Sequence, residues 1–225
     1  MKNVAIIPAR KNSKGVPGKN KRLLNGLPLV CHSIIFAQDN PNIDRVVINT
    51  DDADIIKYCS KNYDNLDIYQ RDSELSKDDT PMVDVLLNYI KNAKTLPELI
   101  ILLQPTSPIR SHKDLDKMLN LMKSNLNIDC VISVSEVPQH YSPHLMLNKF
   151  NNKLTPLFNR VPTRRQDVPP SYIRDGQIYI FRTTSLLNKK AILTDNTYGF
   201  ISSEIGVNID CEEDWTNAVK LLENN

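Results

Sequence analysis

The chain has 225 residues, of which 40% are hydrophobic and 24% are charged, and this composition excludes wholesale disorder. Its formal net charge of +2 argues against a protein that coats nucleic acid or an anionic membrane, so any basic site must be local. No apolar run approaches the roughly 18 residues of a membrane span, and the early charge of Arg10 argues against a secretory signal peptide.

The first two thirds of the chain alternate short apolar runs with amphipathic stretches. This alternation predicts an α/β protein with a mostly parallel sheet and helices on both faces. The apolar runs predict strands at Asn3–Ile7, Arg45–Asn49, Asp67–Tyr69, Leu99–Leu103 and Cys130–Val134. The amphipathic stretches predict helices at Leu27–Gln38, Ala53–Lys61, Met82–Lys91 and Lys113–Lys123, with Thr80 and Ser111 as capping residues.

A segment with six prolines, residues 137–170, interrupts this alternation. It contains two β-like pieces, Leu145–Phe150 and Lys153–Phe158. We expect an inserted arm within one domain that spans residues 1–225, and not a second domain. After the arm, the pattern predicts strands at Tyr172–Phe181 and Glu204–Ile209 and a final helix at Glu212–Leu222.

A basic loop follows the first predicted strand. Residues 10–22 hold six of the 28 Lys and Arg and no acidic residue, whereas an even spread would place about 1.6 basic residues there. Open parallel sheets bind ligands at the carboxyl ends of their strands, and backbone N–H groups near Gly15 and Gly18, with cationic side chains, suit a triphosphate. The glycine spacing matches neither a Walker loop nor a dinucleotide fingerprint. The alternative is a solvated basic loop.

The segment Ile7-Pro-Ala-Arg-Lys-Asn-Ser-Lys-Gly-Val-Pro-Gly-Lys-Asn20 resembles the signature of the CMP-sialic acid synthetases, or N-acylneuraminate cytidylyltransferases. That family includes synthetases for legionaminic and pseudaminic acids. The resemblance implies a Rossmann-like nucleotidyltransferase fold with a dimerisation arm at residues 137–170. Further segments resemble the family in the same order along the chain: Ile48–Asp52, Arg71–Ser76 with Asp79 and Thr80, Gln104–Arg110, Arg164–Pro170, and Asp175–Tyr179.

In this family, the basic loop wraps the phosphates and the cytosine of CTP. The resemblance therefore implies that Arg10 and Lys19 contact the phosphates, with Lys19 neutralising the leaving pyrophosphate. The whole implied nucleotide-binding set is Ala9, Arg10, Asn12, Ser13, Lys14, Gly15, Lys19, Asn20, Arg71 and Thr80.

The acid-sugar side of the site is implied by the later segments. Gln104, Ser107 and Arg110 follow a buried strand and offer an amide, a hydroxyl and a guanidinium to a polyhydroxy acid; the alternative is a proline-shaped turn that caps the next helix. The implied substrate-binding set is Gln104, Ser107, Arg164, Arg165, Asp175 and Tyr179.

Four members of this set have an alternative role or an unfavourable charge. Arg164 and Arg165 match a carboxylate bidentately, although adjacent loop arginines are more often solvated. Asp175 stands where many relatives have Asn, and its carboxylate would repel the substrate's carboxylate unless it pairs with Arg174 or a hydroxyl. Tyr179 is a pocket wall or a core aromatic.

Asn208 and Asp210 are two residues apart on a predicted strand, so we expect both side chains on one face. Their oxygens suit Mg²⁺, with Mn²⁺ as an alternative. The family shows Asp-x-Asp here, and Asn208 lowers the local negative charge, so we expect Asp210 to be the principal metal ligand. The alternative is that Asp210 caps the last helix.

The resemblance implies a cytidylyltransferase that joins CTP to a nine-carbon 2-keto acid sugar of the sialic acid type, with Arg10, Lys19 and Asp210 as catalytic residues. Metal-bound hydroxide or Asp210 would act as the base. The specific sugar is open among sialic, legionaminic and pseudaminic acids. Other interpretations are an eight-carbon acid sugar synthetase, a glycosyltransferase on a similar scaffold, and a non-catalytic CTP-binding regulator.

Four scattered cysteines show no C-x-x-C spacing, so we expect structural thiols, neither a disulfide framework nor a zinc site, and a cytoplasmic location. As partners we expect CTP, the acid sugar and a second copy of the chain in a C2 homodimer, with no nucleic acid and no membrane. The cysteines are Cys31, Cys59, Cys130 and Cys211.

Overall fold

The computed structural model describes residues 2–12, 14–158 and 164–223. The chain divides into two compact units. The first unit comprises Met1–Ser133 with Asp175–Asn225, and the second comprises Val134–Arg174. The predicted inserted segment, residues 137–170, lies inside the second unit.

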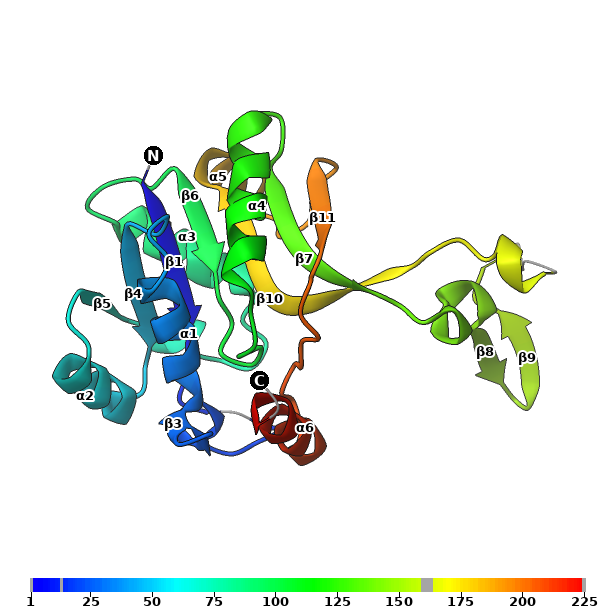
Figure 1. Cartoon of the computed structure of the whole chain (residues 1–225), viewed down its shortest axis with the longest axis horizontal. Helices are drawn as coiled ribbons and strands as arrows, with labels where there is room; N and C mark the ends of the chain where they lie inside the picture. The colour runs from blue at the N-terminus through cyan, green and yellow to red at the C-terminus, as the bar shows by residue number, and fades with distance from the viewer. Residues whose placement is uncertain (1, 13, 159–163, 224–225) are drawn as a thin grey trace. The chain divides into compact units, whose positions relative to one another are not determined.

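A mixed sheet forms the centre of the first unit (Figure 1). Among the described residues its strand order is β11-β7-β10-β6-β1-β4-β5. Strand β1 pairs in parallel with β4 and β6, β4 pairs in parallel with β5, and β10 runs antiparallel to β6, which confirms the mostly parallel sheet. The strands are β1 (Asn3–Pro8), β4 (Arg45–Thr50), β5 (Leu66–Gln70), β6 (Leu99–Leu102), β7 (Cys130–Glu136), β10 (Tyr172–Arg182) and β11 (Thr197–Ile201).

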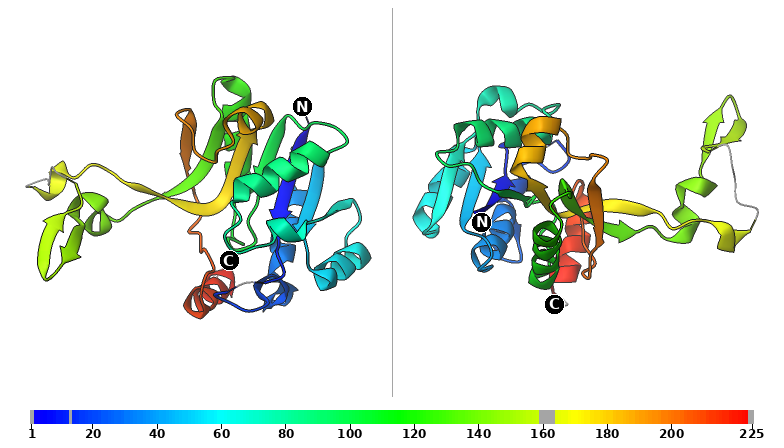
Figure 2. Two further views of the ribbon diagram at one scale, coloured as in Figure 1. Left: turned by 180° about the vertical axis from the view of Figure 1, so that it is seen from behind. Right: turned by 90° about the horizontal axis from the view of Figure 1, so that it is seen from above.

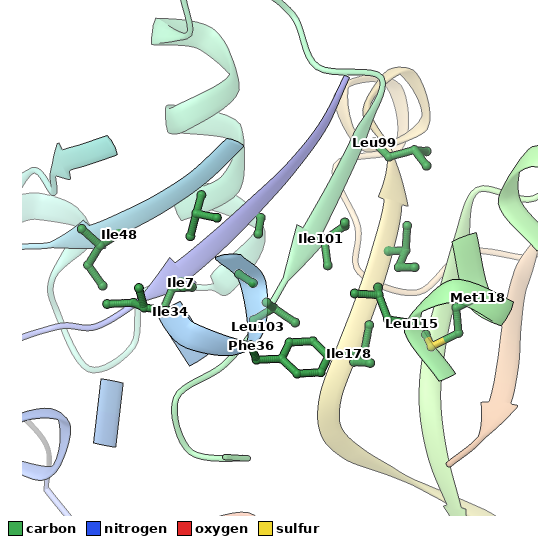
Figure 3. Close-up of a cluster of buried hydrophobic side chains, with 14 of the residues drawn as sticks. Ile7, Ile34, Phe36, Ile48, Leu99, Ile101, Leu103, Leu115, Met118 and Ile178 are labelled. Atoms are coloured by element: carbon green, nitrogen blue, oxygen red, sulfur yellow. The ribbon is translucent and has the colours of Figure 1, made fainter. Parts of the chain in front are cut away.

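Helices cover both faces of this sheet (Figure 2). Side chains from α1, α2 and α4 pack with β1, β4 and β6 in the main hydrophobic core, where Ile7, Ile34 and Met118 are fully buried (Figure 3). Helices α3 and α5 lie on the opposite face. The helices of this unit are α1 (Leu29–Gln38), α2 (Ala53–Asn62), α3 (Met82–Asn92), α4 (His112–Ser124), α5 (Thr183–Lys189) and α6 (Glu212–Glu223).

The starts of the helices follow their capping chemistry. The Asp52 side chain accepts a hydrogen bond from the backbone of Asp54 and so starts α2, and the Ser111 hydroxyl does the same for α4. The predicted Thr80 cap is wrong, because α3 begins after Pro81 and has no side-chain cap. Helix α1 begins at Leu29, two residues later than predicted. Leu27–Pro28 forms β3 instead, in a short hairpin with β2 (Leu23–Leu24).

The predicted strand at Glu204–Ile209 is wrong. This segment is irregular, and the strand lies earlier, at β11. Polar groups in this segment and directly before it form hydrogen bonds that are not those of paired strands. Ser203 donates from its backbone and its hydroxyl to the Asp114 carboxylate, and the Ile209 backbone N–H donates to the Thr106 carbonyl. These contacts hold the segment in place without strand pairing.

The second unit contains a two-stranded hairpin, β8 (Leu147–Phe150) with β9 (Lys153–Pro156). Asn151 and Asn152 have positive φ values of 46° and 64°, the backbone that a two-residue hairpin turn requires. Three short 3₁₀ helices flank it: η3 (Gln139–Tyr141), η4 (Pro143–Leu145) and η5 (Arg165–Asp167).

Candidate active site

Two neighbouring polar cavities open at the carboxyl ends of the parallel strands of the first unit. The smaller has a volume of about 430 Å³, the larger about 1260 Å³, and both are lined by Arg10 and Arg71. Loops after β1, β5 and β6 and the segment before α6 contribute to the smaller cavity. Its described lining residues are Pro8, Arg10, Lys14, Gly15, Lys19, Asn20, Arg71, Met82, Gln104, Pro105, Thr106, Asn208 and Asp210.

The basic loop presents its cations to these cavities. The Arg10 guanidinium and the Lys14 ammonium, the latter 2.7 Å away, both pair with the Asp78 carboxylate. Hydrogen bonds from Lys14 and Arg10 lower the pKa of Asp78. One carboxylate therefore bridges two cations of the nucleotide-binding set that the resemblance implies. The sequence prediction missed Asp78, although its neighbours Asp79 and Thr80 lie in a segment resembling the family.

Lys19 is the most enclosed cation of this loop, with 8% of its surface exposed. It lies in the 3₁₀ helix η1 (Lys19–Lys21), which follows Gly18 with its left-handed φ of 63°. The Lys19 ammonium donates to the Ile209 carbonyl at 2.5 Å and lies 3.4 Å from Asp210 Oδ1. Lys19 and Asp210, which were predicted as catalytic, therefore form one charge pair within the smaller cavity.

Two small features hold the basic loop against the segment that carries Asp210. A Cβ atom placed on Gly15 would lie 1.9 Å from the Asp210 carbonyl oxygen, so only glycine permits this close approach. The Asn20 amide donates to the Arg10 carbonyl at 3.0 Å. Behind them, Val16 and Ile209 are buried with Trp215 of α6 in a hydrophobic cluster, which anchors both segments to the same helix.

Arg71 lies directly after β5 and faces both cavities. Its Nε donates to Asn49 Oδ1 at 2.6 Å, and its Nη2 donates to the Asn49 carbonyl at 3.1 Å. Burial lowers the pKa of Arg71 to about 10, so the guanidinium stays charged at neutral pH. Asn49, at the end of β4, is a site residue that the sequence prediction missed.

The turn after β6 forms another wall of the smaller cavity through Gln104, Pro105 and Thr106. The Ser107 hydroxyl donates to the Asp175 carbonyl at 3.1 Å, and Ser107 is not among the described lining residues of either cavity. Arg110 is partly buried behind this turn and donates to the Gln104 carbonyl at 2.5 Å. Ser107 and Arg110 therefore support the wall from behind.

The Asp175 carboxylate, which would repel an acidic substrate unless it were paired, has hydrogen-bond donors of its own. Its oxygens accept hydrogen bonds from the Ser133 and Ser202 hydroxyls at 2.5 Å each, and from the Gln177 backbone at 3.0 Å. The carboxylate therefore faces hydroxyl and amide donors within the first unit. Tyr179 is buried in β10, with its ring centroid 6.3 Å from that of Phe181. Its position is that of a core aromatic.

Asn208 and Asp210 meet as predicted, but in an irregular segment and not on a strand. Asn208 Nδ2 donates to Asp210 Oδ2 at 2.5 Å. The partners of the Asp210 carboxylate are Lys19 and Asn208, while the Asp214 carboxylate accepts the backbone N–H groups of Asp210 and Cys211 at the start of the last helix. Those hydrogen bonds also lower the pKa of Asp214. Among the described residues, no group of three or more His, Cys, Asp or Glu could hold a metal ion.

The other predicted residues lie elsewhere. Asn12 lines the larger cavity. Arg164 is exposed in the second unit; the side chain of Arg165 and the whole of Ser13 lie outside the described part of the structure. The predicted residues that are described but line neither cavity are Ala9, Thr80, Ser107, Arg164, Asp175 and Tyr179.

The sequence of this chain matches a family of known proteins. The family model described as cytidylyltransferase matches residues 4–214, which include every described residue of the smaller cavity. The chain belongs to the cytidylyltransferase family. The cytidylyltransferase signature therefore covers the first unit up to the start of α6 and the whole second unit.

Two curated relatives represent the proteins that this cytidylyltransferase matches along its length. It is 29% identical over 222 residues to the N-acylneuraminate cytidylyltransferase of Streptococcus agalactiae, covering 97% of this chain and 53% of that protein. It is 33% identical over 218 residues to the CMP-N,N'-diacetyllegionaminic acid synthase of Campylobacter jejuni, covering 94% of this chain and 91% of that protein. The chain thus spans about half the length of the Streptococcus relative and most of the Campylobacter one.

The cytidylyltransferase fold is also seen in a solved CMP:2-keto-3-deoxy-manno-octonic acid synthetase complexed with CTP. That structure matches with a TM-score of 0.78 at 17% identity and covers 100% of this chain and 99% of the other. Within the described residues, no helix has both the length and the hydropathy that a bilayer crossing requires.

Proposed function

We propose that this cytidylyltransferase joins CTP to a nine-carbon 2-keto acid sugar, giving a CMP-sugar and pyrophosphate. The observation that carries the proposal is the smaller cavity, which brings Arg10, Lys19 and Asp210 together at the carboxyl ends of the strands. The relatives named for N-acylneuraminate and for N,N'-diacetyllegionaminic acid support an acid sugar as the second substrate.

The cations of the cavity suit the triphosphate. Arg10, Lys14 and Lys19 come from one loop and Arg71 faces them from β5, so four positive side chains line a space of about 430 Å³. Charge neutralisation by preorganised cations is the main protein contribution to transfer at phosphorus. Lys19 is the strongest candidate to stabilise the leaving pyrophosphate because it is the most enclosed of the loop's cations.

In the proposed reaction, the anomeric hydroxyl of the sugar attacks the α-phosphorus of CTP. A new bond forms between that oxygen and phosphorus, and the bond from the α-phosphorus to the bridging oxygen breaks, so pyrophosphate leaves with the electron pair. The hydroxyl proton must be taken up as the bond forms, and the Asp210 carboxylate, whose side chain is 68% exposed, is the acceptor available in the cavity. Gln104 faces the same space and orients the sugar.

The residues present fit a magnesium ion that is shared with the nucleotide. Mg²⁺ is commonly held by one or two carboxylates, with phosphates and water completing its shell. Asp210 would provide one carboxylate and Asn208 one amide oxygen, both from the lining of the smaller cavity. When bound there, the ion would supply charge neutralisation and lower the pKa of a coordinated hydroxyl. Mn²⁺ would suit the same oxygen donors.

We propose a homodimer formed through the second unit. That unit exposes many large apolar side chains, among them Phe150 at 78% and Leu154 at 60%, which is more apolar surface than a monomer normally leaves in water. A second copy of the chain would cover it, and Arg164 would remain a candidate for the sugar carboxylate. We further propose a cytoplasmic location, which the four free cysteines support.

Pyrophosphate release tests this function. Purified protein with CTP and Mg²⁺ is given sialic, legionaminic, pseudaminic and eight-carbon octulosonic acids in turn. We expect release with a nine-carbon acid, dependent on both CTP and the metal. Release with only the eight-carbon acid would overturn the proposed sugar class. CTP binding without release from any acid would favour the non-catalytic regulator.

A further inference from the structure

Arg110 donates hydrogen bonds to three parts of the fold behind the wall of the smaller cavity. Its Nη2 donates to the Gln104 carbonyl at 2.5 Å, in the turn that lines the cavity. Its Nε donates to the Gln177 carbonyl of β10 at 2.6 Å, and its Nη1 donates to the Ser33 hydroxyl of α1 at 3.0 Å. Arg110 itself is not among the described lining residues of either cavity, so it acts from behind the wall.

The surroundings of Arg110 make its position specific. All three of its acceptors are uncharged, and burial lowers the pKa of the guanidinium to about 9, against an opposing effect of the Asp175 carboxylate. A buried charge is retained only where its hydrogen bonds are satisfied. The fixed fork of a guanidinium reaches three directions at once, which a lysine ammonium on a flexible chain does not reproduce.

The turn that Arg110 holds also supports the reacting groups. The Ser107 backbone N–H closes the turn onto the Gln104 carbonyl, the acceptor that Arg110 also uses. The peptide group between Thr106 and Ser107 continues this set, because the Thr106 carbonyl accepts the Ile209 backbone N–H at 2.8 Å. The Ile209 carbonyl in turn accepts the Lys19 ammonium. One continuous set of hydrogen bonds thus connects Arg110 to the Lys19–Asp210 pair.

We propose that Arg110 is a positioning residue that fixes residues 104–107 and, through Ile209, sets the places of Lys19 and Asp210 in the cavity. Its kinetic consequence rests on the proposed function, whereas its effect on the order of residues 206–211 does not. A purely structural arginine would stabilise the fold without affecting this segment in particular.

The chain contains a matched control. Arg182, at the end of β10, is partly buried and donates to the carbonyls of Ile128, Met122 and Asn125, none of which lines either cavity. The variants Arg110→Lys and Arg182→Lys keep the charge and remove the same fork. Both are compared with the unaltered protein by denaturant unfolding, hydrogen exchange and pyrophosphate release.

In Arg110→Lys, we expect the peptide covering residues 206–211 to exchange about tenfold faster, with no such change in Arg182→Lys. We also expect kcat to fall about tenfold or more in Arg110→Lys, while kcat in Arg182→Lys stays within about twofold, because small displacements of reacting groups are costly in rate. Equal exchange at residues 206–211 and equal rates in the two variants would overturn the proposal.

The experiment also distinguishes failure of the proposed function from failure of the Arg110→Lys variant to fold. If the unaltered protein releases no pyrophosphate, the proposed function fails, and the exchange comparison still decides the role of Arg110. If Arg110→Lys does not fold, Ser33→Ala removes one acceptor and leaves the arginine in place. We then expect exchange at residues 206–211 to rise by about two- to fivefold, and unchanged exchange would overturn the proposal.

Discussion

Lys19 carries more of the proposed chemistry than any other single residue, because it is enclosed, cationic and paired with Asp210. We predict that Lys19→Ala lowers kcat by about 10² or more, since one removed charge-stabilising group typically has that effect. Steady-state pyrophosphate release measures it. Lys11→Ala removes an exposed lysine from the same loop and is the matched control. An unchanged kcat in Lys19→Ala, or an equal loss in Lys11→Ala, would remove Lys19 from the mechanism.

Asp78 stands where the phosphates of CTP are expected to bind, because its carboxylate bridges Arg10 and Lys14. CTP must displace it from both cations. We predict that Asp78→Asn tightens CTP binding about two- to tenfold at low salt, and that the gain shrinks as salt screens the charges. Isothermal titration calorimetry measures this, with Asp79→Asn as the control. Unchanged or weaker binding in Asp78→Asn would contradict this role.

The predicted site residues that line the smaller cavity include those whose position along the chain already places them at the sheet edge. Arg10 follows β1 and Gln104 follows β6, so both reach the cavity. Asp78 was missed because its role depends on a contact with a residue 68 positions away. Ser107 was assigned to the substrate-binding set because it lies in the segment Gln104–Arg110 after a buried strand. In the structure, its hydroxyl donates to the Asp175 carbonyl.

At the scale of elements, the buried strands were predictable, whereas β11 was not. Strands β1 and β6 are continuous apolar runs that are wholly buried. Strand β11 is mostly exposed and interrupted by Gly199, so it lacks both the apolar run and a regular alternation. Helix α5 has seven residues, too few for a helical period to be distinguished. The hairpin ahead of α1 depends on Asn25 and Gly26, both with positive φ.

Asp129 connects β7 to α5 and to the approach to β11, and it gives a prediction about pH. Burial opposes its ionisation, but hydrogen bonds from the Lys189 ammonium and from neighbouring hydroxyls outweigh this effect and lower the pKa to about 2. A depressed carboxyl pKa stabilises the fold above the ordinary value near 3.8, and this contribution is lost as the pH falls through about 2.

We therefore predict that Asp129→Asn lowers the free energy of unfolding by about 1–2 kcal/mol at pH 7. The gap between this variant and the unaltered protein should close between pH 4 and pH 2. Urea unfolding at several pH values measures both quantities. A gap that stays constant down to pH 2 would show that the charge of Asp129 does not contribute.

At the scale of the whole molecule, assembly through the second unit is open to direct test. We predict that the chain sediments at twice the mass of one chain at micromolar concentration. Phe150→Glu with Leu154→Glu, two exposed apolar residues of the β8–β9 hairpin, should give a monomer, because charge would be buried at the interface. Leu126→Glu, an equally exposed position in the first unit, is the control. A monomeric unaltered protein would contradict the proposed homodimer.

The central claim is that the cavity transfers CMP from CTP to the anomeric oxygen of an acid sugar, and isotope tracing tests it most directly. The sugar that releases pyrophosphate is labelled with oxygen-18 at its anomeric hydroxyl, and the products are followed by phosphorus NMR and mass spectrometry. We predict one CMP-sugar phosphodiester that carries the label in its bridging oxygen, together with unlabelled pyrophosphate. Label in the pyrophosphate, or consumption of CTP to CDP and phosphate, would contradict the account.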